Sequence, residues 1–195
     1  FHSAMAAAPV SSGTPGSRIA FITACLETGF GLKTADTVTV ANGVATATFS
    51  GGHSFEPDVI ALVAGATPAG LNGEVRIAAT TAGSVTFPAP GIPDGTATGT
   101  ITLKIAPAGW ELVFSATNAA VYRSLSPEGT RKYLRVDDSS ATNVRVTGYE
   151  HMSDAVTGVG PSPSASQISG GGWWPAASAS GAQARAWTLV ADSKS

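Results

Sequence analysis

The fold is decided by a run of alternating residues at positions 37–49. There the sequence reads Thr37-Val38-Thr39-Val40-Ala41-Asn42-Gly43-Val44-Ala45-Thr46-Ala47-Thr48-Phe49. Asn-Gly between two alternating runs is a strong signal for a tight β-hairpin, because both turn positions need a positive φ. In that register Val38 lies opposite Ala47 and Val40 opposite Ala45. The stretch therefore predicts a hairpin with one apolar face and one threonine face.

More short strands are expected after this hairpin, separated by Gly- and Pro-containing turns. The run at 59–63 is continuously apolar, which is typical of a strand buried on both faces. The other expected strands span residues 74–78, 84–87 and 100–105. Many short strands at close spacing predict a small β-barrel or sandwich over residues 35–106.

Residues 1–34 read as an extended N-terminal arm followed by one short helix. Ser17 is the expected N-cap, and Gly29 is placed to end the helix. A helix of about twelve residues is not stable alone, so its apolar face must dock on something. The docking surface belongs either to another subunit or to the helix's own domain, and both alternatives stay open. The face is formed by Ile19, Ile22 and Leu26.

Residues 107–195 are expected to form a second β-rich domain. A hairpin is predicted from strands at 131–136 and 143–147, with turn residues at 137–140. A Gly-, Pro- and Ser-rich loop covers 153–180, and a last strand is expected at 185–190. The hairpin residues able to face outward include Tyr133, Arg135, Arg145 and Thr147.

Composition favours a chain that lies against neighbouring subunits. Charged residues make up 12%, about half the usual share, so the surface is weakly hydrated and weakly repelling. An Ala-rich chain from a GC-rich genome, or a secreted protein, would have the same composition. The net charge is −2 and the basic residues are scattered, which argues against direct nucleic-acid binding.

The ends of the chain and its hydropathy give further expectations. No run of about 18 apolar residues occurs, so no membrane insertion is expected. No secretory signal is visible, and because the chain starts at Phe1 we expect it to begin inside its gene product. A continuation beyond Ser195 is also expected, so the second domain would be truncated here.

Little in the sequence indicates catalysis, and we expect a protein without a cofactor that is not an enzyme. Cys25 lies among apolar residues and is expected to be a buried structural thiol. No nucleophile elbow, paired carboxylates or phosphate-binding loop is present. Neither the histidines nor the aspartates have metal-ligand spacing, and the residues concerned are His2, His53, His151, Asp137, Asp138 and Asp154.

The aromatic residues of the second half suggest a surface function. Trp173 and Trp174 follow three glycines, and exposed tryptophans on such a loop can stack on sugars or anchor an interface. The alternative is that they cover a core, and core or interface is favoured over sugar binding. The candidate interface residues are Ile19, Ile22, Leu26, Trp173, Trp174, Arg135 and Arg145.

Two parts of the sequence resemble bacteriophage proteins. Residues 52–60, 65–74 and 84–87 resemble a small β-module that recurs in phage tail, baseplate and fibre proteins. Ser54 stands where that module often has a second glycine, so a positive φ is not required there. The second half is similar to a group of uncharacterised phage virion proteins, over residues 114–115, 118–124, 133–138 and 144–161.

The resemblance implies a non-enzymatic structural component of a phage particle, associated with the tail, baseplate or connector and assembled in symmetric copies. It supplies no catalytic residues. Its partners would be other copies of itself and other virion proteins, and its location the virion, assembled in the host bacterial cytoplasm. The alternative is a capsid decoration protein or a receptor-binding module that contacts a host-surface glycan.

Overall fold

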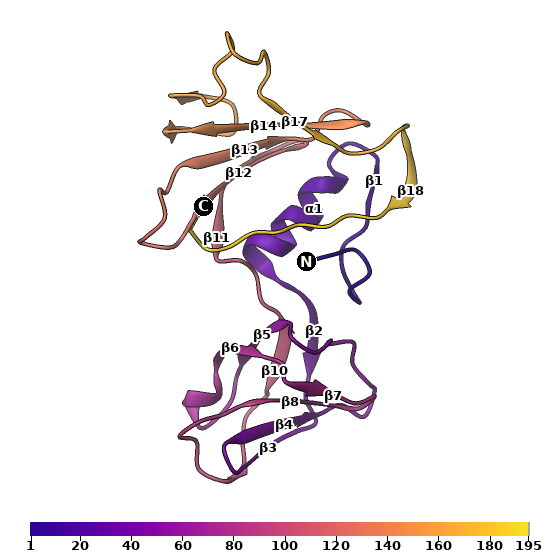
Figure 1. The fold of residues 1–195 in the computed structure, drawn as a ribbon, viewed down its shortest axis with the longest axis vertical. Helices are drawn as coiled ribbons and strands as arrows, with labels where there is room; N and C mark the ends of the chain where they lie inside the picture. Colours follow the sequence, from indigo (N-terminus) through magenta and orange to yellow (C-terminus); the bar gives the residue numbers. More distant parts are fainter. Residues whose placement is uncertain (195) are drawn as a thin grey trace. The chain divides into compact units, whose positions relative to one another are not determined.

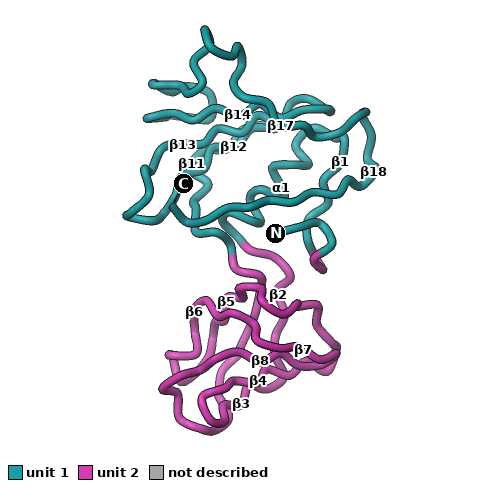
Figure 2. The backbone as a smooth tube through the Cα atoms, viewed as in Figure 1, with its two compact units in different colours: residues 1–4, 8–28, 107–195 teal, residues 5–7, 29–106 magenta. Residues whose placement is uncertain are grey.

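The computed structural model describes residues 1–194, which divide into two compact units (Figures 1 and 2). Unit 1 comprises residues 1–4, 8–28 and 107 onward, and unit 2 comprises residues 5–7 and 29–106. The chain is mainly β with one short helix, as predicted. The arm and helix, expected as a separate segment, belong for the most part to unit 1.

Unit 2 contains two antiparallel sheets and no closed barrel. One sheet has the order β2-β10-β5-β6 and the other β7-β8-β4-β3-β9. A short 3-10 turn, η2, spans Ala69–Leu71. The strands are β2 (Phe30–Thr34), β3 (Thr37–Ala41), β4 (Val44–Thr48), β5 (Ile60–Ala64), β6 (Gly73–Arg76), β7 (Ala79–Thr80), β8 (Ser84–Pro88), β9 (Gly95–Thr96) and β10 (Thr102–Ile105).

The β3–β4 hairpin forms in the predicted register. Val38 pairs with Ala47 and Val40 with Ala45, and all four side chains are buried. The turn residues Asn42 and Gly43 both have positive φ, at 53° and 73°. The local signal was therefore sufficient to place this hairpin.

Strand β5 differs from the prediction. Ala61 and Val63 are buried, Leu62 is partly buried, and Ile60 and Ala64 are exposed, so only one face of the strand is fully covered. The continuous apolar run at 59–63 predicted burial on both faces. An antiparallel strand with one covered face has the same sequence pattern when its solvent-facing residues are also apolar, so the pattern does not distinguish the two cases.

Unit 1 is built on a five-stranded antiparallel sheet with the order β11-β12-β13-β14-β17. The predicted second hairpin is present, with Val136 opposite Val146 and Arg135 opposite Thr147. The strands of the sheet are β11 (Trp110–Ala116), β12 (Ala119–Ser124), β13 (Tyr133–Asp137), β14 (Asn143–Tyr149) and β17 (Gly172–Pro175). Strand β17 therefore lies inside the segment expected to be a loop.

The helical segment covers one face of this sheet. Helix α1 spans Ser17–Thr23 and continues as a π-helical turn, η1, over Ala24–Thr28. Gly29 ends the segment as predicted, with φ 69°. Ser17 is not the N-cap: Gly16 holds that position, and the Ser17 hydroxyl instead bonds the backbone of Ser12.

Both faces of the unit 1 sheet are covered. On the α1 side, Phe21, Ile22 and Leu26 pack with sheet residues that include Tyr122 and Val136. On the other side, Val121 and Tyr133 pack against Met152 and Ala155. Met152 lies in the short ribbon of β15 (His151–Met152) and β16 (Gly158–Val159), and Ala155 in the loop that joins these two strands. The prediction that Tyr133 and Thr147 face solvent is therefore wrong, since both are buried.

In unit 1 the N-terminal segment runs beside residues 181–189 (Figure 1). Strand β1 (Ser11–Gly13) pairs with β18 (Gly181–Arg185), and residues 1–3 run antiparallel to residues 187–189. The Phe1 ammonium donates to the Leu189 carbonyl at 3.1 Å. The N-terminal segment is thus not a free arm, and the last strand ends at Arg185 rather than 190. No helix within residues 1–194 is long and apolar enough to cross a membrane.

Candidate functional site

A buried ion pair organises the part of unit 1 where β1, α1 and the β13–β14 turn meet. Arg18 lies in α1 and Asp138 in the turn, 120 residues later, and their side chains are 3% and 0% exposed. The guanidinium approaches Asp138 Oδ1 at 2.5 Å, and Oδ2 accepts the Arg18 backbone N–H at 2.9 Å. Asp138 therefore caps the helix that carries its partner, where a carboxylate also favours the helix dipole.

The Arg18 guanidinium also donates to three backbone carbonyls from two segments: that of Ser12, and those of Ser140 and Ala141. Its remaining donor, Nε, is buried and has no hydrogen-bond partner among residues 1–194. Burial raises the pKa of Asp138, while the adjacent guanidinium and the backbone N–H groups oppose that shift. The sequence placed Asp138 in a turn but gave no indication of this pair, because neither residue has a local partner.

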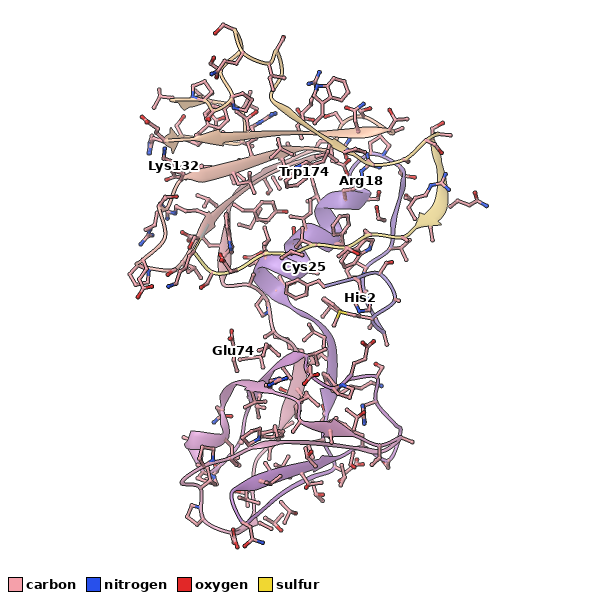
Figure 3. The ribbon with its side chains drawn as sticks, viewed as in Figure 1. His2, Arg18, Cys25, Glu74, Lys132 and Trp174 are labelled. Atoms are coloured by element: carbon pink, nitrogen blue, oxygen red, sulfur yellow. The ribbon has the colours of Figure 1, made fainter. Side chains whose placement is uncertain are left out.

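An open groove of about 390 Å³ lies beside Arg18 in unit 1. Its apolar floor includes Phe21, Ile22 and Val144, and the Phe21 ring stacks on the Trp187 ring with centroids 4.4 Å apart. Figure 3 shows Arg18 on α1, with Trp174 also labelled. The complete lining is Ser11, Arg18, Phe21, Ile22, Val144, Trp174, Pro175, Ala176, Ala186, Trp187, Thr188, Leu189 and Val190.

The adjacent tryptophans of β17 point to opposite faces of the sheet. Trp174 pairs with buried Val144 and lines the groove, while Trp173 pairs with Arg145. Their exposed fractions are 40% and 56%. Because successive strand residues alternate in direction, the two rings do not form one aromatic surface. Sequence reasoning had grouped them because it treated the segment as a loop.

The two candidate interface arginines are held by their own unit. The Arg145 guanidinium lies 3.5 Å from the centroid of the Trp173 ring and donates to the Gly171 carbonyl. Arg135 donates to the Ala155 carbonyl and to Asp137, each at 2.9 Å. Arg145 therefore covers one face of the Trp173 ring and leaves the other exposed, whereas Arg135 links the 149–157 segment to the sheet.

The candidate residues of the helix are placed in the core of unit 1. Ile22 and Leu26 are 2% and 4% exposed, and Ile19 packs against the same cluster. Of the two alternatives left open by the sequence, docking on its own domain is the one observed. These three residues are therefore not available as a contact surface for another subunit.

The surroundings of the candidate nucleophile and of the candidate metal ligands indicate structural roles. Cys25 is free and fully buried, and this burial raises the pKa of its thiol to about 12. A protonated thiol is a poor nucleophile, so Cys25 serves packing. Burial likewise raises the pKa of Tyr122 to about 12, although its hydroxyl lies 2.7 Å from the Thr23 hydroxyl. Among residues 1–194, no three His, Cys, Asp or Glu side chains gather as metal ligands would.

Asp137 and Asp154 act as local turn supports. Burial opposes ionisation of Asp137, but hydrogen bonds from Ser139 and Arg135 more than offset it and lower the pKa. Asp154 accepts the backbone N–H groups of Val156 and Thr157, each at 2.7 Å, and these bonds lower its pKa. Bonds of this kind explain why aspartates occupy these positions without a ligand.

Comparison with known proteins identifies no relative of this chain. No protein-family model matches the chain. No curated protein and no solved structure is significantly similar to it.

Proposed function

We propose that this chain is a non-enzymatic structural component of a bacteriophage particle, associated with the tail, baseplate or connector and present in several symmetric copies. The resemblance to phage proteins supports this context, over residues 52–60, 65–74 and 84–87 in the first half and 114–115, 118–124, 133–138 and 144–161 in the second. The low charge supports a chain covered by neighbours. The location that follows is the virion, assembled in the host bacterial cytoplasm.

The observation that carries the proposal is the edge strand β17. It pairs with β14 on one side only, and its four residues, Gly172–Pro175, carry no charge. Natural sheet edges are usually blunted by charged side chains or covered, because a bare edge pairs with other chains. Pro175 shortens this edge, but two half-exposed tryptophans remain on it. Such an edge is expected to be covered in an assembly.

The titratable groups are consistent with a structural role. The thiol of Cys25 is held protonated by burial, and the Asp138 carboxylate is bound to Arg18. Both groups thus have partners or surroundings that explain their perturbed pKa values without a reaction. Structural ion pairs perturb pKa values as active sites do, so perturbation alone does not indicate catalysis.

The first test is immunogold labelling of intact particles with an antibody to residues 110–195. Label at the tail or neck is the expected result. Label over the whole head would favour the decoration protein, and absence of label would overturn the proposal. Mass spectrometry of purified particles would give the copy number, which should be a multiple of the local symmetry.

A matched pair of variants tests the β17 edge itself. Trp173→Ala should weaken incorporation into particles by about 30-fold, the effect of losing a central aromatic contact of ~2 kcal/mol. Val156→Ala is the control, since Val156 is 69% exposed on another loop of unit 1. Equal incorporation of both variants would contradict a role for this edge.

The second candidate is a decoration or receptor-binding protein that contacts a host glycan through Trp173. The half-exposed Trp173 ring, steadied by Arg145, is the observation that favours it. Binding to an array of host-surface glycans that disappears in Trp173→Ala would support this candidate. Binding to no surface polysaccharide would exclude this reading.

A further inference from the structure

The groove beside Arg18 has an extended wall with unpaired backbone groups. Residues 187–189 bond residues 1–3 through Trp187 and Leu189: the Ser3 N–H donates to the Trp187 carbonyl, and the Leu189 N–H donates to the Phe1 carbonyl. In this antiparallel pattern the N–H and C=O of Thr188 point away from residues 1–3. They find no other partner within residues 1–194, and Thr188 lines the groove.

Strand β17 forms another wall of the groove, and some of its backbone groups also point away from the neighbouring strand. The Ala176 N–H donates to the Thr142 carbonyl, so Asn143 and Pro175 form a non-hydrogen-bonded pair. The backbone groups of Trp174 therefore face β14, whereas those of Trp173 and the Pro175 carbonyl face away from it. Because β17 is the last strand of the sheet, these outward groups have no strand to pair with.

The floor of the groove is mainly apolar. Phe21, Ile22 and Val144 provide the apolar part. Arg18 also lines the groove, and its Nε is a buried donor without a partner in the described chain. Because the Nε is closed to solvent, an occupant of the groove does not reach it, and the surface offered to that occupant is mainly apolar.

The charge of the groove limits what can fill it. The Arg18 guanidinium is already neutralised by Asp138 at 2.5 Å, and no other ionisable side chain lines the groove within the described residues. A charged occupant would lose its hydration without gaining a counter-ion. An uncharged occupant would instead match the apolar floor.

We propose that the groove binds an extended, uncharged peptide segment of a neighbouring protein chain. The segment pairs with the free backbone groups of Thr188 and places one apolar side chain on the floor beside Phe21. Recognition of this kind, in which backbone bonds supply affinity and a pocket supplies specificity, is β-strand addition. The volume of about 390 Å³ lies in the usual range for binding cavities and admits only a few residues.

This inference rests on the proposed function, because the segment belongs to a neighbour in the particle. The deciding measurement is amide hydrogen exchange of the whole protein, free in solution and within purified particles. The Thr188 amide should exchange at least about 100-fold more slowly in particles, since it gains a partner there. Exchange at the same rate in both states would overturn the inference while leaving the chain's presence in particles, measured by mass spectrometry, intact.

Two substitutions separate the groove from the rest of the surface. Ala186→Glu adds a carboxylate to an exposed residue of the groove wall and should abolish the Thr188 protection. Ala182→Glu adds the same charge to an exposed residue of β18 that does not line the groove, and should leave it unchanged. Near-equal melting temperatures of the two free proteins would show that both fold.

The remaining outcomes would each overturn the proposed peptide binding. Protection of the Trp174 indole from oxidation in particles, without protection of the Thr188 amide, would indicate a small ligand in the groove and overturn the peptide. Loss of protection in both variants would mean that the effect is not local to the groove, which also overturns it. Absence of the chain from particles would remove the proposed function and this inference together.

Discussion

The ion pair between Arg18 and Asp138 is expected to dominate the stability of unit 1. Replacing Arg18 by methionine keeps much of the side-chain volume but leaves Asp138 as a fully buried carboxylate without its counter-ion. Breaking a buried pair by removing one partner typically costs about 3–5 kcal/mol. A small domain has a total free energy of unfolding of about 5–15 kcal/mol, so the Arg18→Met variant should retain only part of its stability.

Tryptophan fluorescence during urea denaturation gives a direct assay. All four tryptophans of the chain lie in unit 1, so the signal reports on that unit without a contribution from unit 2. At pH 7 the Arg18→Met midpoint should fall while the slope with urea stays constant. Changing the ionic strength from about 0.05 to 0.5 M should alter the loss little, because buried pairs are weakly screened.

The double variant Arg18→Met with Asp138→Leu separates the pair from other effects of the substitutions. It removes both charges, so its loss of stability should be smaller than the sum of the two single losses, by about 0.5–3 kcal/mol. Two additive single losses would refute the reasoning, since they would show that the residues do not interact. A loss below about 1 kcal/mol for Arg18→Met would refute it equally.

Three further predictions concern other parts of the chain. Above pH 9 the stability of unit 1 should fall, because the pKa of Cys25 is raised from 9.0 and that of Tyr122 from 10.0, each to about 12, so the unfolded chain loses these protons first. Urea denaturation at increasing pH should show a slope of up to about 1.4 kcal/mol per pH unit for each group, and Cys25→Ala should remove the first contribution. Gly43→Ala should destabilise unit 2 by about 1–2 kcal/mol, because alanine is strained at φ 73°, whereas Gly51→Ala, which meets open space at an ordinary φ, should be neutral when amide exchange of β4 is measured. Gly171→Ala should detach β17, since a Cβ there would lie 2.1 Å from the Thr147 hydroxyl oxygen, and faster exchange of the Trp174 amide would report it.

The sequence predicted those parts of the fold whose signals are local. The β3–β4 hairpin depends on Asn42 and Gly43 and on an alternation within thirteen residues, and it formed in the expected register. The β13–β14 hairpin was predicted for the same reason. In both, the turn and the strands agree, so no distant contact is needed to decide the pairing.

Pairings between distant segments were not predictable in this way. Strand β17 pairs with β14 although its Gly- and Trp-rich sequence has no alternation. Residues 187–189 look like a strand, but their backbone pairs with residues 1–3, at the other end of the chain. The Arg18–Asp138 pair joins residues 120 apart, and an isolated arginine in a helix gives no sign of which carboxylate it meets. Such choices are made by tertiary packing, which a single sequence does not display.

The opposite orientations of Trp173 and Trp174 bear on the choice between the two candidate functions. A sugar-binding platform made of both rings would need them on one surface, but the strand places Trp174 toward the groove with Val144 and Trp173 on the far face with Arg145. The face of Trp173 beneath Arg145 is occupied by a guanidinium 3.5 Å from the ring centroid, which leaves the opposite ring face for a ligand. A neighbouring chain that covered the β17 edge would contact both rings at once, because the edge lies between the two faces. The geometry therefore favours a protein partner over a glycan.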